Sequence, residues 1–163
     1  MNEDVIVVKV KEKLKTILTF ENKLILIVSF IMGLITHFYF YTNECISPDA
    51  LEAGFINMAG DWEMQLGRWG IQVIDFLKGG LVNSFLTTVF SILVLSIATI
   101  FLVKLLKIKN PIIITLLSAL IVTTPQVAET LMFVYCADSY HFAMLLSVLA
   151  VYFIYKENKF KNY

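Results

Sequence analysis

The sequence predicts an all-α membrane protein with about four transmembrane helices and one amphipathic helix beside the membrane. Of its 163 residues, 58% are hydrophobic and 16% are charged, whereas soluble domains carry about 25% charged residues. The hydrophobic residues form long runs of the ~20 residues that a helix needs to cross a bilayer. Lysines gather between these runs. An ordinary soluble domain and a disordered chain are both excluded.

The chain reads as a single transmembrane domain. The expected spans are residues 24–41, 84–103, 108–124 and 139–155. The segments around them are a basic segment at 1–23, an outer loop at 42–83, a short connection near 104–107, an outer connection at 125–138 and a tail at 156–163.

The distribution of basic residues predicts the orientation. All of the 13 basic residues except Arg68 and Lys78 lie in segment 1–23, in the connection after the second span or in the tail. Cytoplasmic loops of membrane proteins carry the excess of Lys and Arg. We therefore expect a multi-pass protein of the plasma membrane with both termini in the cytoplasm. The net charge of zero gives no basic field, so no nucleic-acid partner is expected.

The outer loop contains the pattern of an amphipathic helix over residues 61–78. Its apolar residues recur at helical spacing, and they are Trp62, Leu66, Trp69, Val73 and Phe76. A polar face follows the same spacing, with Asp61, Gln65, Arg68, Gln72 and Asp75. Tryptophan favours the membrane–water boundary, so Trp62 and Trp69 are expected to anchor this helix on the outer surface. Gly79-Gly80 is expected to end it.

Arg68 is the single arginine of the chain. A guanidinium holds a phosphate through two parallel hydrogen bonds, which an ammonium cannot do. Its place on an interfacial helix therefore suggests a lipid phosphate as its ligand. The alternatives are an ion pair with an acid of the same segment (Asp61, Glu63 or Asp75) and simple anchoring among lipid head groups.

Asp49 follows the first span within a helix start. Ser47 can cap this helix, Pro48 suits its first position, and an acid favours its positive end. Capping alone explains the residue. The alternative is a general base at the depth of a lipid-linked head group.

Other residues allow both a structural and a functional interpretation. His37, inside the first span, is expected to bond a neighbouring helix. Asp138 and His141 could share a helix face and bind a metal or relay protons, although a capping aspartate with a nearby histidine is simpler. Cys45 and Cys136 both fall on the outer side and are treated as free thiols, because sequence alone cannot place them within bonding distance.

The order of the short motifs is similar to one known family. A first span is followed by Ser47-Pro48-Asp49, by Gly67-Arg68-Trp69-Gly70, by a second span and by Tyr135-Cys136-Ala137-Asp138-Ser139. Over about residues 20–158, the chain resembles the beginning of the GtrII-type glucosyltransferases. That resemblance implies a GT-C-like amino-terminal module, an active site on the outer face and a polyprenyl-phosphate-linked sugar donor. Members of the family have more spans, so we expect this chain to be an amino-terminal part.

The resemblance also implies roles for individual residues. Asp49 and Asp138 occupy the places of the two catalytic acids, and Arg68 would lie near the donor phosphate. Asp138 would orient the acceptor or help to hold a divalent metal, although no local metal motif is present. The implied partners are the lipid bilayer, the lipid-linked sugar (glucose in this family) and a cell-surface glycan acceptor. The alternative function is a small non-enzymatic protein, such as a lipid-linked sugar flippase or an accessory subunit.

Overall fold

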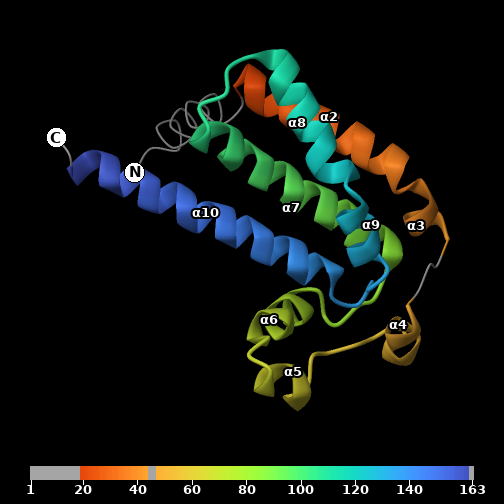
Figure 1. The fold of residues 1–163 in the computed structure, drawn as a ribbon. Coiled ribbons are helices and arrows are strands. Elements are labelled where there is room, and N and C mark those ends of the chain that lie inside the picture. The colour runs from red at the N-terminus through yellow and green to blue at the C-terminus, as the bar shows by residue number, and fades with distance from the viewer. Residues whose placement is uncertain (1–18, 44–46, 162–163) are drawn as a thin grey trace, which may run out of the picture.

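The computed structural model describes residues 19–43 and 47–161, and within these ranges the regular structure is α-helical (Figure 1). The helices are α2 (Phe20–Thr36), α3 (Phe38–Thr42), α4 (Pro48–Ala53), α5 (Asp61–Gln65), α6 (Trp69–Leu77), α7 (Ser84–Leu105), α8 (Pro111–Thr123), α9 (Pro125–Leu131) and α10 (Ala137–Lys161). The only β contact in these ranges is an isolated bridge between Ile56 and Leu81. The predicted all-α class is confirmed. Most of segment 1–23 lies outside the described residues, and so does Cys45.

The central element is α7, which packs against α10 on one side and against α2, α3 and α8 on others (Figure 1). Its side chains are buried on several faces, as expected for a helix that is surrounded by neighbours. Asn83 caps its first turn, with Oδ1 accepting a hydrogen bond from Leu86 N at 2.9 Å. The bundle core therefore forms around α7.

Small residues set the close approach of α2 to α7. A Cβ added to Gly33 would lie 3.0 Å from side-chain carbons of Ile92, which is too near without movement. Close packing through small residues is typical of helices that associate within a membrane. Gly33 is therefore explained by helix packing.

Three helical stretches are long and apolar enough to cross a membrane: Ser84–Leu105, Pro111–Leu131 and Ala137–Glu157. The membrane character of the chain is confirmed by these stretches. The first predicted span, 24–41, is not among them, because the helix breaks at His37 into α2 and α3. His37 is fully buried there, and its Nε2 donates to Val122 O at 2.7 Å. The expected bond from His37 to a neighbouring helix is confirmed.

The helical stretch after residue 108 continues beyond its predicted end. Residues 125–138 were expected to be an outer connection, but Pro125–Leu131 forms α9 directly after α8. Thr124, between the two helices, is extended, as favoured for a residue before proline. The non-helical part of this segment is the turn between Leu131 and Ala137, which we call the 132–136 turn.

The helix predicted over 61–78 is two helices, and this is a correction. Gly67 has a φ of 75°, a left-handed conformation that favours glycine, and it ends α5. Gly67 N donates to Met64 O and Arg68 N donates to Glu63 O, at 3.0 and 2.8 Å. This pair of bonds is a Schellman C-cap. A second one, at Gly79 and Gly80, ends α6 as predicted.

Candidate active site

Asp49 lies in the first turn of α4, which forms as its sequence predicts. Ser47 Oγ accepts a hydrogen bond from Ala50 N at 3.3 Å, and Pro48 occupies the first position of the helix. Ser47 N donates to Met132 O at 3.1 Å. This last bond fixes the start of α4 against the 132–136 turn, so that the exposed Asp49 side chain faces the region of α9 and that turn.

Arg68 lies at the junction of α5 and α6, and its side chain is exposed. Two of the three acids considered as partners are engaged elsewhere: Glu63 Oε2 accepts from Gly60 N at 2.8 Å, and Asp75 pairs with Lys78. Among the described residues, no ion pair involves Arg68. The guanidinium is therefore available to an external anion.

Asp49 and Arg68 are separated in the sequence, but they line the same cavity. This Asp49 cavity has a volume of about 500 Å³. The elements around it are α4, the α5–α6 junction, α9, the 132–136 turn and the start of α10, which meet at one end of the bundle in Figure 1. The lining residues are Asp49, Arg68, Gln126, Glu129, Thr130, Phe133, Tyr135 and Tyr140.

The Asp49 cavity contains a protonated phenol. Burial raises the pKa of Tyr135 to about 12, with smaller contributions from Cys136 and from the Asp49 carboxylate. Tyr135 is therefore a hydrogen-bond donor at neutral pH. Burial also raises the pKa of Cys136 to about 11, so this free thiol stays protonated and is a poor nucleophile.

A second cavity, of about 370 Å³, adjoins the first and is almost wholly apolar. The two cavities share Gln126, Thr130 and Tyr140 in their walls. This apolar cavity lies between the α8–α9 stretch and α10, both of which are long enough to cross a membrane. Its remaining lining residues are Ile121, Thr124, Val127, His141 and Met144. The two cavities are therefore neighbours, one with charged residues in its walls and one with a mostly apolar surface.

Asp138, the second predicted acid, lies outside the Asp49 cavity and is buried, with 4% of its surface exposed. Its Oδ2 is 3.0 Å from Lys78 Nζ, which is also 3.3 Å from Asp75 Oδ1 and donates to Tyr135 O at 3.1 Å. Asp75 Oδ2 accepts from Ala59 N at 2.9 Å. This cluster of Asp75, Lys78 and Asp138, the Lys78 cluster, joins α6 to α10.

Sequence reasoning missed the Lys78 cluster. Asp75 was expected on the polar, outward face of one long helix, but it is fully buried. Burial raises its pKa, although the bonds to Ala59 and Lys78 oppose that shift. The sequence signal was Lys78 itself, because it is the one lysine outside the segments predicted to be cytoplasmic.

The described residues of the site do not form a set of ligands for a divalent metal. No group of three or more His, Cys, Asp and Glu side chains is placed to hold an ion in ranges 19–43 and 47–161. The ammonium of Lys78 already occupies the cation position beside Asp138. His141 is buried near the apolar cavity, and its Nδ1 has no hydrogen-bond partner in the described structure.

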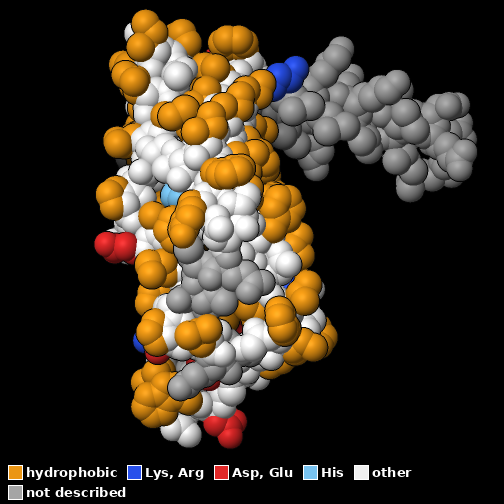
Figure 2. Space-filling view, turned by 90° about the vertical axis from the view of Figure 1, so that its right-hand side faces the viewer, with side chains coloured by type: hydrophobic (Ala, Val, Ile, Leu, Met, Phe, Trp, Pro, Cys, Tyr) orange, Lys and Arg blue, Asp and Glu red, His pale blue; other side chains and the backbone are white. Residues whose placement is uncertain are grey.

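The residues of the predicted apolar stripe on α5 and α6 are exposed, as membrane contact requires. Trp62 is 68% exposed and Trp69 is 63% exposed. Figure 2 shows hydrophobic side chains spread over most of the visible face, with acidic groups confined to a few places. A surface of this kind fits a lipid environment better than water.

We expect both tryptophans to lie at the membrane interface. In vesicles, their fluorescence should be blue-shifted and weakly quenched by aqueous iodide, because each ring is surrounded by lipid. Variants Trp62→Phe and Trp69→Phe separate the two contributions. Strong iodide quenching of both single-tryptophan variants would contradict the placement of α5 and α6 on the membrane.

The fold and the site define the class of protein: a helical membrane protein with a polar, acid-containing cavity at one end of its apolar helices. Residues 38–163 match the family model described as glucosyl transferase GtrII, and the chain belongs to this family. The family supports a glycosyltransferase function. No curated protein and no solved structure gives a significant match.

Proposed function

We propose that the protein transfers a sugar from a polyprenyl-phosphate donor to a cell-surface glycan at the outer face of the plasma membrane. The observation that carries this proposal is the pair of neighbouring cavities, which share Gln126, Thr130 and Tyr140 in their walls. A lipid-linked sugar phosphate has a charged head and a long apolar chain. The Asp49 cavity offers Arg68 to the head, and the apolar cavity between two membrane-length helices suits the first part of the chain.

In the proposed reaction, Asp49 acts as the general base. Its carboxylate takes the proton of an acceptor hydroxyl while that oxygen attacks the anomeric carbon of the donor sugar. The bond between the anomeric carbon and the phosphate oxygen breaks, and polyprenyl phosphate leaves with the electron pair. Arg68 stabilises the negative charge that develops on this leaving group. Tyr135, which stays protonated, is a further hydrogen-bond donor in the same cavity.

For Asp138 we propose a positioning role through Lys78. The Lys78 cluster holds the carboxyl end of α6 against the start of α10. Arg68 precedes α6, and Tyr140 belongs to α10, so the cluster connects two walls of the Asp49 cavity. Asp138 would thus hold α6 and α10 in a fixed relative position, and it would not contact the sugar.

The outward orientation of the site is also a proposal. It is supported by the lysine distribution, which assigns both termini to the cytoplasm. It is further supported by the fold, because the Asp49 cavity lies at the end of α7 that contains its first residue, far from the lysines at its last turn. The acceptor glycan would then approach from outside the cell.

Photocrosslinking with a diazirine-bearing polyprenyl phosphate in native membranes tests the donor site. We expect crosslinks at the apolar cavity, for example at Ile121 or Met144. Arg68→Ala should weaken this binding about 10- to 100-fold, because a charge-assisted contact is lost. Arg68→Lys should give an intermediate loss, because the charge remains and the paired hydrogen bonds do not.

Lys109→Ala is the matched control, since Lys109 is an exposed basic residue remote from both cavities. It should bind like the wild type. Equal binding by the wild type, Arg68→Ala and Arg68→Lys would show that Arg68 is only a head-group anchor. Crosslinks spread evenly over the exposed apolar residues of α2 would contradict the donor site altogether.

A further inference from the structure

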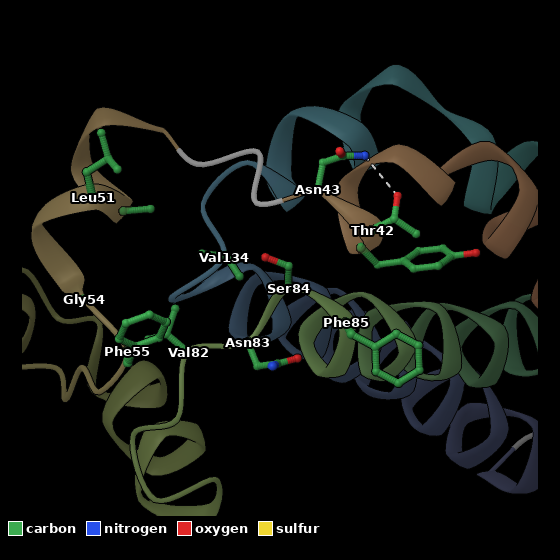
Figure 3. A pocket seen from close by; sticks show the side chains of 12 residues that line it. Thr42, Asn43, Leu51, Gly54, Phe55, Val82, Asn83, Ser84, Phe85 and Val134 are labelled. Atoms are coloured by element: carbon green, nitrogen blue, oxygen red, sulfur yellow. Dashed lines mark hydrogen bonds between the residues drawn. The ribbon is translucent and has the colours of Figure 1, made fainter.

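A third cavity adjoins α4, and the described residues that line it carry no charge. Its volume is about 420 Å³, within the range of about 300–1,000 Å³ that is typical of small-molecule sites. Figure 3 shows Leu51 and Phe55 on one side of this space and Thr42, Asn43 and Phe85 on the other. We call it the uncharged cavity, since none of the described residues that line it is Asp, Glu, Lys, Arg or His.

The chemistry of the lining suits a neutral, hydroxyl-rich ligand. Carboxamides and hydroxyls are present without an ion, so there is no group that would neutralise a phosphate or a carboxylate. Three aromatic rings, those of Tyr41, Phe55 and Phe85, also line the space. The face of an aromatic ring is electron-rich and attracts the slightly positive C–H groups on the face of a sugar ring.

Two carboxamides each keep one hydrogen-bonding group free, a donor on Asn83 and an acceptor on Asn43. Asn83 uses Oδ1 to cap α7, and its Nδ2 donates to no other group in the described structure. Asn43 uses Nδ2, which donates to Tyr39 O at 3.2 Å and to Thr42 Oγ1 at 3.0 Å (Figure 3), and its Oδ1 stays available as an acceptor. A sugar hydroxyl both donates and accepts, so it can satisfy either group.

The backbone around Phe55 is fixed, and its ring is left uncovered. Val82 N donates to Phe55 O at 3.0 Å, and Asn57 N donates to Gly80 O at 2.8 Å, so the backbone on both sides of Phe55 is fixed. The Phe55 side chain is nevertheless 79% exposed. Across the cavity, the rings of Tyr41 and Phe85 meet edge to face with their centroids 5.9 Å apart. Exposed aromatic rings offer faces on which a sugar ring can stack.

The uncharged cavity is directly adjacent to the Asp49 cavity. Asp49 lines one and Ala50 lines the other, and the same alternation occurs at Tyr135 and Val134. Neighbouring residues of the chain thus contribute to both cavities at two places. The two cavities therefore lie on either side of the same short segments, close enough for adjacent units of one glycan to be considered.

We propose that the uncharged cavity binds a neutral sugar unit of the acceptor glycan next to the unit that reacts at Asp49. The assignment rests on the proposed function, because that function requires an acceptor. It adds the location of the acceptor subsite and the class of sugar that this subsite takes, which is an uncharged hexose or deoxyhexose. Anionic sugars would be disfavoured there, since no cation faces the cavity.

Saturation-transfer NMR of the full chain in nanodiscs tests this proposal without requiring catalysis. The probes are the neutral trisaccharides maltotriose, mannotriose and galactotriose, with trigalacturonic acid as the anionic counterpart. We expect at least one neutral probe to bind and the anionic probe to bind more weakly. Phe55→Leu should weaken neutral binding about two- to tenfold, because it keeps an apolar side chain but removes the ring. Phe55→Trp should keep the binding.

The matched control is Phe76→Leu, since Phe76 is 76% exposed, lies on α6 and lines none of the three cavities. It should bind the neutral probes like the wild type. A further variant, Asn83→Asp, keeps the cap of α7 but removes the Nδ2 donor and adds a charge, and it should also bind more weakly.

The outcomes separate this proposal from the proposed function. Neutral binding that depends on Phe55, together with no donor crosslinking, would support the sugar subsite and contradict the lipid-linked donor. If the donor crosslinks but the neutral trisaccharides bind equally to the wild type and to Phe55→Leu, only the sugar subsite would be overturned. The sugar subsite would also be overturned if none of the neutral probes bound. The same holds if a short-chain lipid competed with these probes for the site at Phe55.

Discussion

Replacement of Asp49 by Asn should lower sugar transfer about 10²- to 10⁴-fold, which is the contribution expected of a general base. The amount of protein in the membrane should not change. Asn fits the start of a helix nearly as well as Asp, and the Ser47 cap is not altered. The measurement is transfer from polyprenyl-phosphate glucose to glycan in membranes that contain the complete gene product, normalised to protein amount.

Glu129→Gln is the matched control for this prediction. Glu129 is an exposed carboxylate in the same cavity, so its replacement removes the same charge without removing the proposed base. We expect a change of less than about tenfold, because a nearby charge affects the reaction only through the local field. Equal losses in Asp49→Asn and Glu129→Gln would assign the effect to the charge of the cavity. Unchanged transfer in Asp49→Asn would contradict the role of Asp49.

Replacement of Lys78 by Met should have the largest effect on stability. The Lys78 side chain is 19% exposed, and its removal leaves two buried carboxylates, Asp75 and Asp138, without a counter-ion. Loss of one partner of a buried ion pair costs about 3–5 kcal/mol in free energy of unfolding. Reversible unfolding in mixed micelles measures it. Lys78→Arg should keep most of the stability, and Lys109→Met, at an exposed lysine, should resemble the wild type.

The pH dependence of the Lys78→Met variant gives this prediction a second readout. Burial raises the pKa of Asp75 in the folded state, so the folded state binds this proton more tightly than the unfolded chain. The free energy of unfolding therefore increases as the pH falls through that raised pKa toward the ordinary value of 3.8. Without Lys78 the pKa of Asp75 is raised further. The loss in free energy of unfolding caused by Lys78→Met should therefore become smaller as the pH falls.

Asp75→Asn in the Lys78→Met background should abolish most of that pH dependence. The double variant removes the titrating group while preserving the shape of the side chain. A deficit of Lys78→Met that is independent of pH in both backgrounds would show that Lys78 contributes through packing of its aliphatic chain and not through charge.

The sequence predicted the parts of the fold that depend on local chemistry. The helix start at Ser47 follows from its capping side chain, and the end of α6 follows from Gly79-Gly80. The break of the predicted helix at Gly67 was missed. Periodicity continues across Gly67, and nothing local distinguishes a glycine that interrupts a helix from one that is tolerated within it.

The candidate site was only partly predictable, because it depends on contacts between distant segments. Asp49 and Arg68 were identified singly, from the loop position of the first and the uniqueness of the second. That they line one cavity follows from the bond between Ser47 and Met132, which tertiary packing creates. The Lys78 cluster was missed for the same reason, since Asp138 is distant in sequence from Asp75 and Lys78.

The most direct test of the central claim is a transfer assay with purified protein in nanodiscs, supplied with radiolabelled glucose on polyprenyl phosphate and with a neutral glycan. The proposed function predicts that the label moves from lipid to glycan in the wild type. It also predicts that Asp49→Asn binds the lipid but does not transfer its sugar. Movement of the intact lipid-linked sugar between leaflets, without transfer to glycan, would contradict the account and would instead indicate a flippase.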